Sequence, residues 1–199
     1  MLALAFAVAS LALGAPAQAE TRCGTKELHG KTLTLYAMHV TCAEVQQITA
    51  GDCDVDGEPW FCSSAHVPGP ALFWRRETER YEPRPTAWIE ARRPPCSQSK
   101  VTRAAWNRAR KRVDDPFPTQ MQMLADDLIR CKQLRGKSRA AVLKVLRGGG
   151  LGGEDDKRSL SWAIGPERTL STPDPKDGEY FVVVFDRNGK VRSVGIEAL

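Results

Sequence analysis

Hydrophobic residues in the first half of the chain alternate with polar residues, a period of two that predicts β-strands. In residues 31–40, Leu33, Leu35 and Ala37 occupy every second position, as on a strand with one buried face. Short stretches rich in aromatic and branched residues predict three further strands, at residues 59–62, 70–77 and 86–93.

Helical spacing replaces this alternation just before residue 50 and again after residue 100. Thr41 and Glu44 form the sequence pattern of a capping box, which predicts the start of the first helix. Thr119 and Gln122 repeat that pattern further along the chain. Three helices are predicted in the second half, at residues 101–113, 119–131 and 138–146, the last with Ser138 as its N-cap.

Strand patterns return in the last quarter of the chain, at residues 159–164, 179–186 and 190–198. The final two strands are joined through Asn188-Gly189, a strong hairpin signal because both residues tolerate positive φ. Together the elements predict an α+β fold. We expect a small disulfide-rich β-α-β-β domain, followed by helices packed on an antiparallel three- to four-stranded sheet.

Composition and charge divide the chain into four segments. Residues 1–19 are uncharged, are mostly apolar and end in Ala17-Gln18-Ala19, which predicts a signal peptide cleaved near Ala19 rather than a membrane span. Residues 20–95 hold 9 Lys/Arg and 11 Asp/Glu, whereas residues 96–199 hold 20 and 13. We therefore expect a disulfide-rich α+β domain at 20–95, a basic helical connector at 96–116 and a helix-helix-sheet module at 117–199.

Six cysteines in a chain with this N-terminus predict up to three disulfides, although the sequence does not choose a pairing. Disulfides form in oxidising compartments, so we expect a secreted or periplasmic protein. The cysteines are Cys23, Cys42, Cys53, Cys62, Cys96 and Cys131.

A spaced set of residues in the second half carries a resemblance to a bacterial envelope module. The set comprises Leu134, Gly136, Lys137, Ser138, Val142, Leu143, Leu146 and Gly148, followed by Trp162, Gly165, Phe185 and Gly189. Residues 117–197 thereby resemble the helix-helix-sheet units of β-lactamase inhibitor proteins and of the small lipoprotein of the outer-membrane β-barrel assembly machinery. The resemblance implies a non-enzymatic sheet that binds a protein. The chain departs from that lipoprotein in lacking the lipidated cysteine.

The first part resembles small secreted cysteine-rich bacterial domains, and this resemblance implies no particular activity. The matching residues are Cys23-Gly24, Val40-Thr41-Cys42, Val45 and Trp60-Phe61-Cys62.

Candidate metal and cofactor sites have plainer interpretations. Asp52, Asp54 and Asp56 alternate before Gly57, as at the start of a calcium loop, but Ser63 stands where an EF-hand needs glutamate. We interpret the segment as a turn, with a weak calcium site as the alternative. Residues 131–138 imitate a phosphate-binding loop but lack its first glycine. We therefore expect no metal and no cofactor.

Catalytic patterns are also absent from the sequence. The three histidines, His29, His39 and His66, have no partner at metal-ligand or nucleophile spacing. Among the tryptophans, Trp60, Trp88 and Trp106 are expected in the core. Trp74 and Trp162 are candidate interface anchors, with the core the better interpretation for Trp162.

The sequence therefore predicts an exported, non-enzymatic protein-binding module, either an envelope assembly factor or an inhibitor-like protein. Its partner would be an unidentified envelope or secreted protein, with no nucleic acid and no membrane span. The candidate contact residues are Ser161, Trp162 and Arg192. Two alternatives stay open: an anionic polysaccharide or headgroup binder that uses basic helices within 100–112 and 130–147, and a hydrolase of unknown type.

Overall fold

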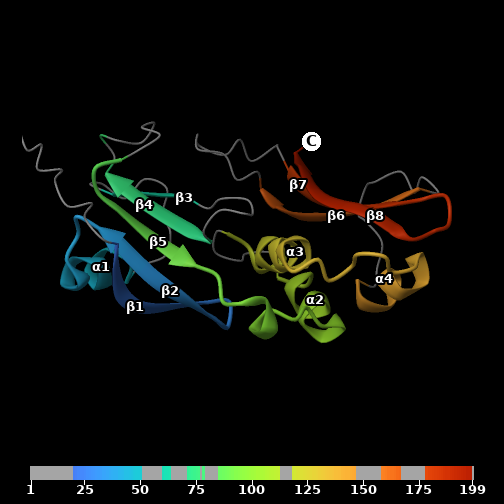
Figure 1. Cartoon of the computed structure of the whole chain (residues 1–199), viewed down its shortest axis with the longest axis horizontal. Coiled ribbons are helices and arrows are strands. Elements are labelled where there is room, and N and C mark those ends of the chain that lie inside the picture. The colour runs from blue at the N-terminus through green and yellow to red at the C-terminus, as the bar shows by residue number, and fades with distance from the viewer. Residues whose placement is uncertain are drawn as a thin grey trace, which may run out of the picture.

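The computed structural model describes residues 20–50, 60–63, 71–76, 78, 85–112, 118–146, 158–166 and 178–198. These residues form an α+β fold with two separate antiparallel sheets, so the predicted class is confirmed. The first sheet has five strands in the order β1-β2-β5-β4-β3, and the second has three in the order β6-β7-β8. The two sheets lie towards opposite ends of the molecule, with helix α3 between them (Figure 1).

The five-stranded sheet buries one face in an apolar core. The alternation expected on β2 is confirmed, since Leu33, Leu35 and Ala37 are all buried. Val45 of α1 packs into the same core, and the Thr41/Glu44 capping box that starts this helix is present. The elements of this unit are β1 (Thr21–Leu28), β2 (Lys31–Met38), α1 (Cys42–Ile48), β3 (Trp60–Ser63), β4 (Leu72–Arg76) and β5 (Trp88–Arg92).

Strand β1 is an element that the hydrophobic pattern does not predict. Only Cys23 and Leu28 are buried along it, so the sequence shows no alternation. Among the described strands β1 pairs only with β2, through a two-residue turn in which His29 and Gly30 both have positive φ, as a type I′ hairpin requires. A disulfide between Cys23 and Cys42 links β1 to α1. A covalent bond and a turn therefore hold a strand that burial alone would not specify.

The second unit packs three helices on one face of the three-stranded sheet (Figure 1). The indole of Trp106 contacts the rings of Trp162 and Phe181, with centroids 6.1 and 6.0 Å away. All three side chains are buried, as predicted for Trp106. The elements are a short 3₁₀ turn (Cys96–Gln98), α2 (Arg103–Ala109), α3 (Gln120–Arg130), α4 (Arg139–Val145), β6 (Ser159–Pro166), β7 (Gly178–Phe185) and β8 (Val191–Ala198).

Helix starts and the last hairpin follow the sequence signals. The Thr119/Gln122 capping box and the Ser138 N-cap are both present. Strands β7 and β8 pair through the expected turn, where Gly189 has φ +69°. The Asp186 carboxylate accepts hydrogen bonds from the backbone N–H groups of Asn188 and Lys190, at 2.8 and 2.9 Å. The turn therefore depends on Asp186 as well as on the Asn-Gly pair.

Residues 96–116 were expected to form a connector, and their described part contributes to a core. Val101, Trp106 and Ala109 are buried in the apolar cluster of the second unit. Thr102 caps α2 by accepting a hydrogen bond from the Ala105 N–H. The segment thus belongs to the packing of the helices on the second sheet. None of the helices in the described ranges is long and apolar enough to cross a membrane.

Helix α3 is shared by both units. From Met121 to Leu128 every residue is buried, whereas an ordinary surface helix buries one stripe. Met123 joins the core of the first sheet, while Leu124 and Leu128 join the core of the second. His29 adds a contact across the same junction, since its Nε2 atom lies 2.7 Å from the carbonyl oxygen of Pro118.

Two buried carboxylates on α3 complete the junction between the units. Asp126 accepts a hydrogen bond from the Arg93 guanidinium at 2.5 Å, and both side chains are almost fully buried. Asp127 pairs with Lys31 of β2 and with Arg130, the latter at 2.9 Å. Three cations thus share two carboxylates. Burial, followed by the Arg130 and Arg93 guanidinium groups, lowers the pKa of Lys31 from 10.5 to about 8.

Candidate functional site

The three-stranded sheet has an outer face that the helices do not cover. Along β7, Phe181, Val183 and Phe185 are buried against the helices, and the residues between them point the other way and are half-buried. We call the opposite side of the sheet the outer face. It consists of Tyr180, Val182 and Val184 on β7, with register neighbours Ser159, Ser161 and Ala163 on β6 and Ser193, Gly195 and Glu197 on β8.

The residues predicted for partner contact are distributed over three environments. Ser161 lies on the outer face, opposite Val182 of β7. Arg192 is exposed at the start of β8, where the register with β7 shifts by one residue. Trp162 is 2% exposed and packs against Trp106 and Phe181. Trp162 therefore contributes to the core, and we leave it out of the contact surface proposed below.

Polar groups on α3 set the position of the sheet against the helices. The Thr119 hydroxyl donates to the carbonyl oxygen of Ile164 at 2.6 Å, and the Gln122 amide donates to Pro166 at 2.6 Å and to the buried Glu179 carboxylate at 3.2 Å. Gly165 allows this approach: at its φ of +149°, a Cβ atom would lie 2.9 Å from the Thr119 methyl group. These contacts hold the backbone of the sheet, and with it the outer face, in one position against α3.

The helical side of the second unit differs from the outer face in its charge, because the exposed charged residues of its described segments all have the same sign. Among residues 96–112 and 118–146, the only acidic residues are Asp126 and Asp127, and both are buried. The exposed charges there are all basic. They are Lys100, Arg103, Arg108, Arg110, Lys111, Arg112, Lys132, Arg135, Lys137 and Lys144. We call this set the basic side.

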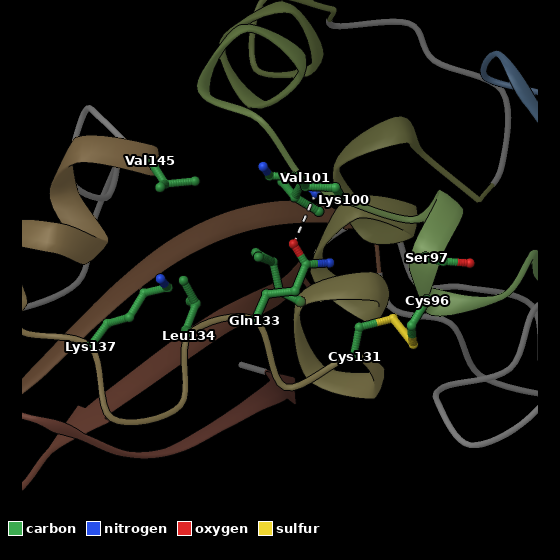
Figure 2. A pocket seen from close by; sticks show the side chains of 10 residues that line it. Cys96, Ser97, Lys100, Val101, Cys131, Gln133, Leu134, Lys137 and Val145 are labelled. Carbon is green, nitrogen blue, oxygen red and sulfur yellow. Dashed lines mark hydrogen bonds between the residues drawn. A yellow bond between two sulfur atoms is a disulfide. The ribbon is translucent and has the colours of Figure 1, made fainter.

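A cleft of about 400 Å³ opens on the basic side beside the Cys96–Cys131 disulfide (Figure 2), and we call it the disulfide cleft. Its lining comprises Cys96, Ser97, Lys100, Val101, Leu128, Cys131, Gln133, Leu134, Lys137 and Val145. Figure 2 shows the Lys137 side chain running beside Leu134, with its nitrogen on the side of Val145. The cleft thus combines apolar walls with two ammonium groups.

The walls of the disulfide cleft are held by internal bonds. The Gln133 amide accepts from the Val101 N–H at 2.9 Å and donates to the Ser99 carbonyl oxygen at 2.8 Å, so the end of α3 is tied to the approach to α2. The disulfide between Cys96 and Cys131 makes a second, covalent link between the same two walls. Arg130 adds a third, donating to the Pro94 carbonyl oxygen at 2.9 Å.

Sequence reasoning did not assemble this cleft. Its residues come from two segments about thirty residues apart, and no spacing in either segment marks a ligand site. The sequence analysis singled out Cys96 and Cys131 only as disulfide cysteines, and Lys100 and Lys137 as members of basic stretches. The one usable signal was Cys131, since a cysteine that pairs across the chain brings its neighbours together.

Two tryptophans differ from the expected roles. Trp74 was a candidate anchor and is 3% exposed, in the core of the first sheet. Trp88 was expected in the core, yet it is partly exposed on the opposite face of that sheet, with its ring 6.2 Å from that of Phe73. Arg92 lies over the Tyr36 ring on the same face, 4.2 Å from its centroid. A shift of one residue along a strand moves a side chain from the buried face of the sheet to the opposite face, which accounts for both differences.

The remaining predicted sites are only partly covered by the structure. Asp52, Asp54 and Asp56, like Cys53 and His66, lie outside the described residues. In the described part, no group of three metal-ligating side chains gathers. Cys62 is disulfide-bonded, as are the two pairs named above. His29 lies in the turn between β1 and β2 and His39 directly follows β2, and both have positive φ.

Comparisons with protein-family models, with curated proteins and with solved structures found no match to this chain. The resemblance of residues 117–197 to inhibitor and assembly modules therefore stays a prediction.

Proposed function

We propose that this protein is an exported binding protein that acts by docking the outer face of its three-stranded sheet onto another protein. The observation that carries the proposal is the half-buried stripe of Tyr180, Val182 and Val184 at the centre of that face, which no helix of the described residues covers. An aromatic side chain and two branched ones present apolar area to a partner. Small residues on both neighbouring strands leave that stripe accessible.

The rigidity of the outer face supports a binding role. The buried rings of Trp162 and Phe181 lie directly behind it, and the hydrogen bonds from Thr119 and Gln122 attach its first strand to α3. A surface held in one conformation loses little conformational entropy on association, which favours affinity. A strand position such as Ser161 can therefore be tested without altering the core.

The cysteines support export. In the described residues, Cys23 is bonded to Cys42 and Cys96 to Cys131, and Cys62 is also in a disulfide. Such bonds persist in the periplasm or outside the cell and are rare in the cytosol. The partner on this proposal is an envelope or secreted protein, met after removal of the signal peptide predicted at residues 1–19.

Partner capture with matched variants tests the proposal. Oxidised protein (residues 20–199) is immobilised and exposed to native secreted and envelope fractions, and retained proteins are identified by mass spectrometry. Ser161→Arg places a large charged side chain on the outer face, and Ala140→Arg makes the same change at an exposed position of α4. We expect one protein to be retained by the wild type and by Ala140→Arg, and lost with Ser161→Arg at unchanged thermal stability. If Ser161→Arg and Ala140→Arg both retain the same protein as the wild type, the proposal is contradicted.

A second candidate function, binding to an anionic polymer or headgroup surface, is favoured by the basic side. Every exposed charged residue in residues 96–112 and 118–146 is basic, and both acidic residues of those segments are buried in ion pairs. Such binding weakens steeply with salt, whereas an apolar sheet contact does not. Retention on dextran sulfate that disappears at high salt, and that is insensitive to Ser161→Arg, would identify this second function.

A further inference from the structure

We propose that the disulfide cleft binds a single-chain fatty-acid carboxylate, with the carboxylate at Lys100 and Lys137 and the alkyl chain against the apolar walls. This inference goes beyond the proposed function, because the cleft lies among the helices and the proposed docking face lies on the other side of the sheet. It assigns the cleft a ligand of its own.

The charge of the cleft selects an anion. Lys100 and Lys137 are exposed at its edge, and neither has an ion-pair partner among the described residues. No acidic side chain lines the cleft. The remaining polar side chains are neutral: the Gln133 amide is engaged with backbone groups, and the Ser97 hydroxyl is exposed. An anionic head group therefore meets two cations and no repulsion.

The apolar lining selects a hydrocarbon body rather than a compact ion such as phosphate. Val101, Leu128 and Leu134 are between 1 and 5% exposed, and Val145 of α4 forms another part of the wall. The volume of about 400 Å³ falls within the range of roughly 300–1,000 Å³ that is usual for small-molecule sites. A linear chain suits a site that is apolar inside and cationic at its edge.

The cleft is formed before any ligand arrives. The disulfide and the Gln133 hydrogen bonds hold its two walls at a fixed separation. A ligand therefore does not have to order the site, and the free energy of burying its methylenes is retained as affinity. Reduction of the disulfide removes one of these links, so reduced protein should bind the same ligand more weakly.

Calorimetric titration with hexanoate, octanoate and decanoate tests the proposal. We expect affinity to rise about fourfold for each methylene that enters the cleft and then to level off once the cleft is full. Decanol, which has the same chain without the charge, should bind more weakly than decanoate. Chemical shifts of backbone amides should change at Ser97, Gln133 and Leu134 and stay constant on β7.

Charge-matched variants separate this site from general attraction to the basic side. Lys100→Gln and Lys137→Gln should each weaken decanoate binding about fivefold. Lys144→Gln removes the same charge from an exposed position of α4 outside the cleft and should leave binding unchanged. Equal losses in all three variants, equal affinity for decanol, or no binding of decanoate at millimolar concentration would each overturn the proposal. None of these results depends on the outer face of the sheet.

Discussion

The two units of this protein differ in the number of strands and helices around their cores and in how aromatic side chains are arranged in them. The first sheet places five strands over a core in which Trp74 lies among smaller, mostly aliphatic side chains, with one seven-residue helix and a disulfide at its edge strand. The second has three strands under three helices, and its core contains a cluster of three contacting rings, those of Trp106, Trp162 and Phe181, among aliphatic side chains. The first core also takes Met123 from α3, a helix whose Leu124 and Leu128 pack in the second core. In the described residues the first unit has fewer helices than the second, and Met123 of α3 adds to the apolar contacts of its core.

The junction between the units is where they can be separated experimentally, and it should give the largest effect. Asp126→Asn leaves the Arg93 guanidinium buried without its carboxylate, which should cost about 3–5 kcal/mol of the free energy of unfolding. Adding Arg93→Met to this variant should restore part of the loss, since the buried guanidinium is then removed together with the carboxylate. Urea denaturation measures both variants.

A matched control for that experiment is the exposed pair between Glu20 and Arg92. Glu20→Gln should cost at most about 1 kcal/mol, because water screens this pair. If Asp126→Asn cost no more than Glu20→Gln, the junction would not hold the two units together.

The disulfides should rank next, and they allow a direct comparison of the units. The bond between Cys96 and Cys131 spans 35 residues and that between Cys23 and Cys42 spans 19. Replacing either pair by serine should cost about 3–4 kcal/mol in the chain-entropy account, with the larger loss for the longer loop. Thermal melting of the two double variants tests this order. A melting temperature that dithiothreitol leaves unchanged would contradict a structural role for both bonds.

The pH dependence of stability should report on the charge imbalance at the junction. The pKa of Lys31 is about 8 in the folded protein and 10.5 in the unfolded chain, so between these values the unfolded chain holds the extra proton. Stability should therefore rise with pH through this window, by about 1–2 kcal/mol after allowance for solvent screening. Denaturation at pH 7.5 and 9.5, compared with Lys31→Met as a variant lacking this titration, measures the difference. The same rise in both proteins would assign it to other groups.

The smallest effect is expected at two turns that share a strained backbone. Lys132 has φ +50° and His29 has φ +51°. Lys132→Gly should stabilise the protein by about 0.5–1 kcal/mol, because glycine adopts this conformation without strain. His29→Gly should bring no gain, since it also removes the contact between the imidazole and the Pro118 carbonyl group. Melting temperatures of the two variants give the comparison, and equal gains would show that the histidine contact contributes nothing.

Local signals in the sequence predicted local structure well. The capping boxes at Thr41 and Thr119 and the N-cap Ser138 all start helices in the structure, because these side chains act on backbone groups within three residues. The strands of the second sheet and their last hairpin follow the predicted ranges closely. In each case the interactions that form the element join residues that are close together in the sequence.

Features that depend on distant residues were not predictable in the same way. Strand β1 is polar and is held by a disulfide to residue 42, and Trp74 and Trp88 exchanged their expected faces because strand register was unknown. The sequence also does not show that Asp127 pairs with Lys31, 96 positions earlier, or that Asp126 pairs with Arg93, 33 positions earlier. The candidate cleft was missed for the same reason. No pattern within a short window shows which residues meet in space.

The sharing of α3 has a consequence for the order in which the protein can be made. A ribosome releases the five strands of the first sheet before α3 exists, so this sheet emerges without Met123 to close its core and without Asp127 to pair with Lys31. The part that is synthesised first is thus completed only after about forty further residues have followed the last strand of that sheet. Until then its apolar face stays accessible to chaperones, and a chain that terminates early at the end of β5 would be left with that face uncovered.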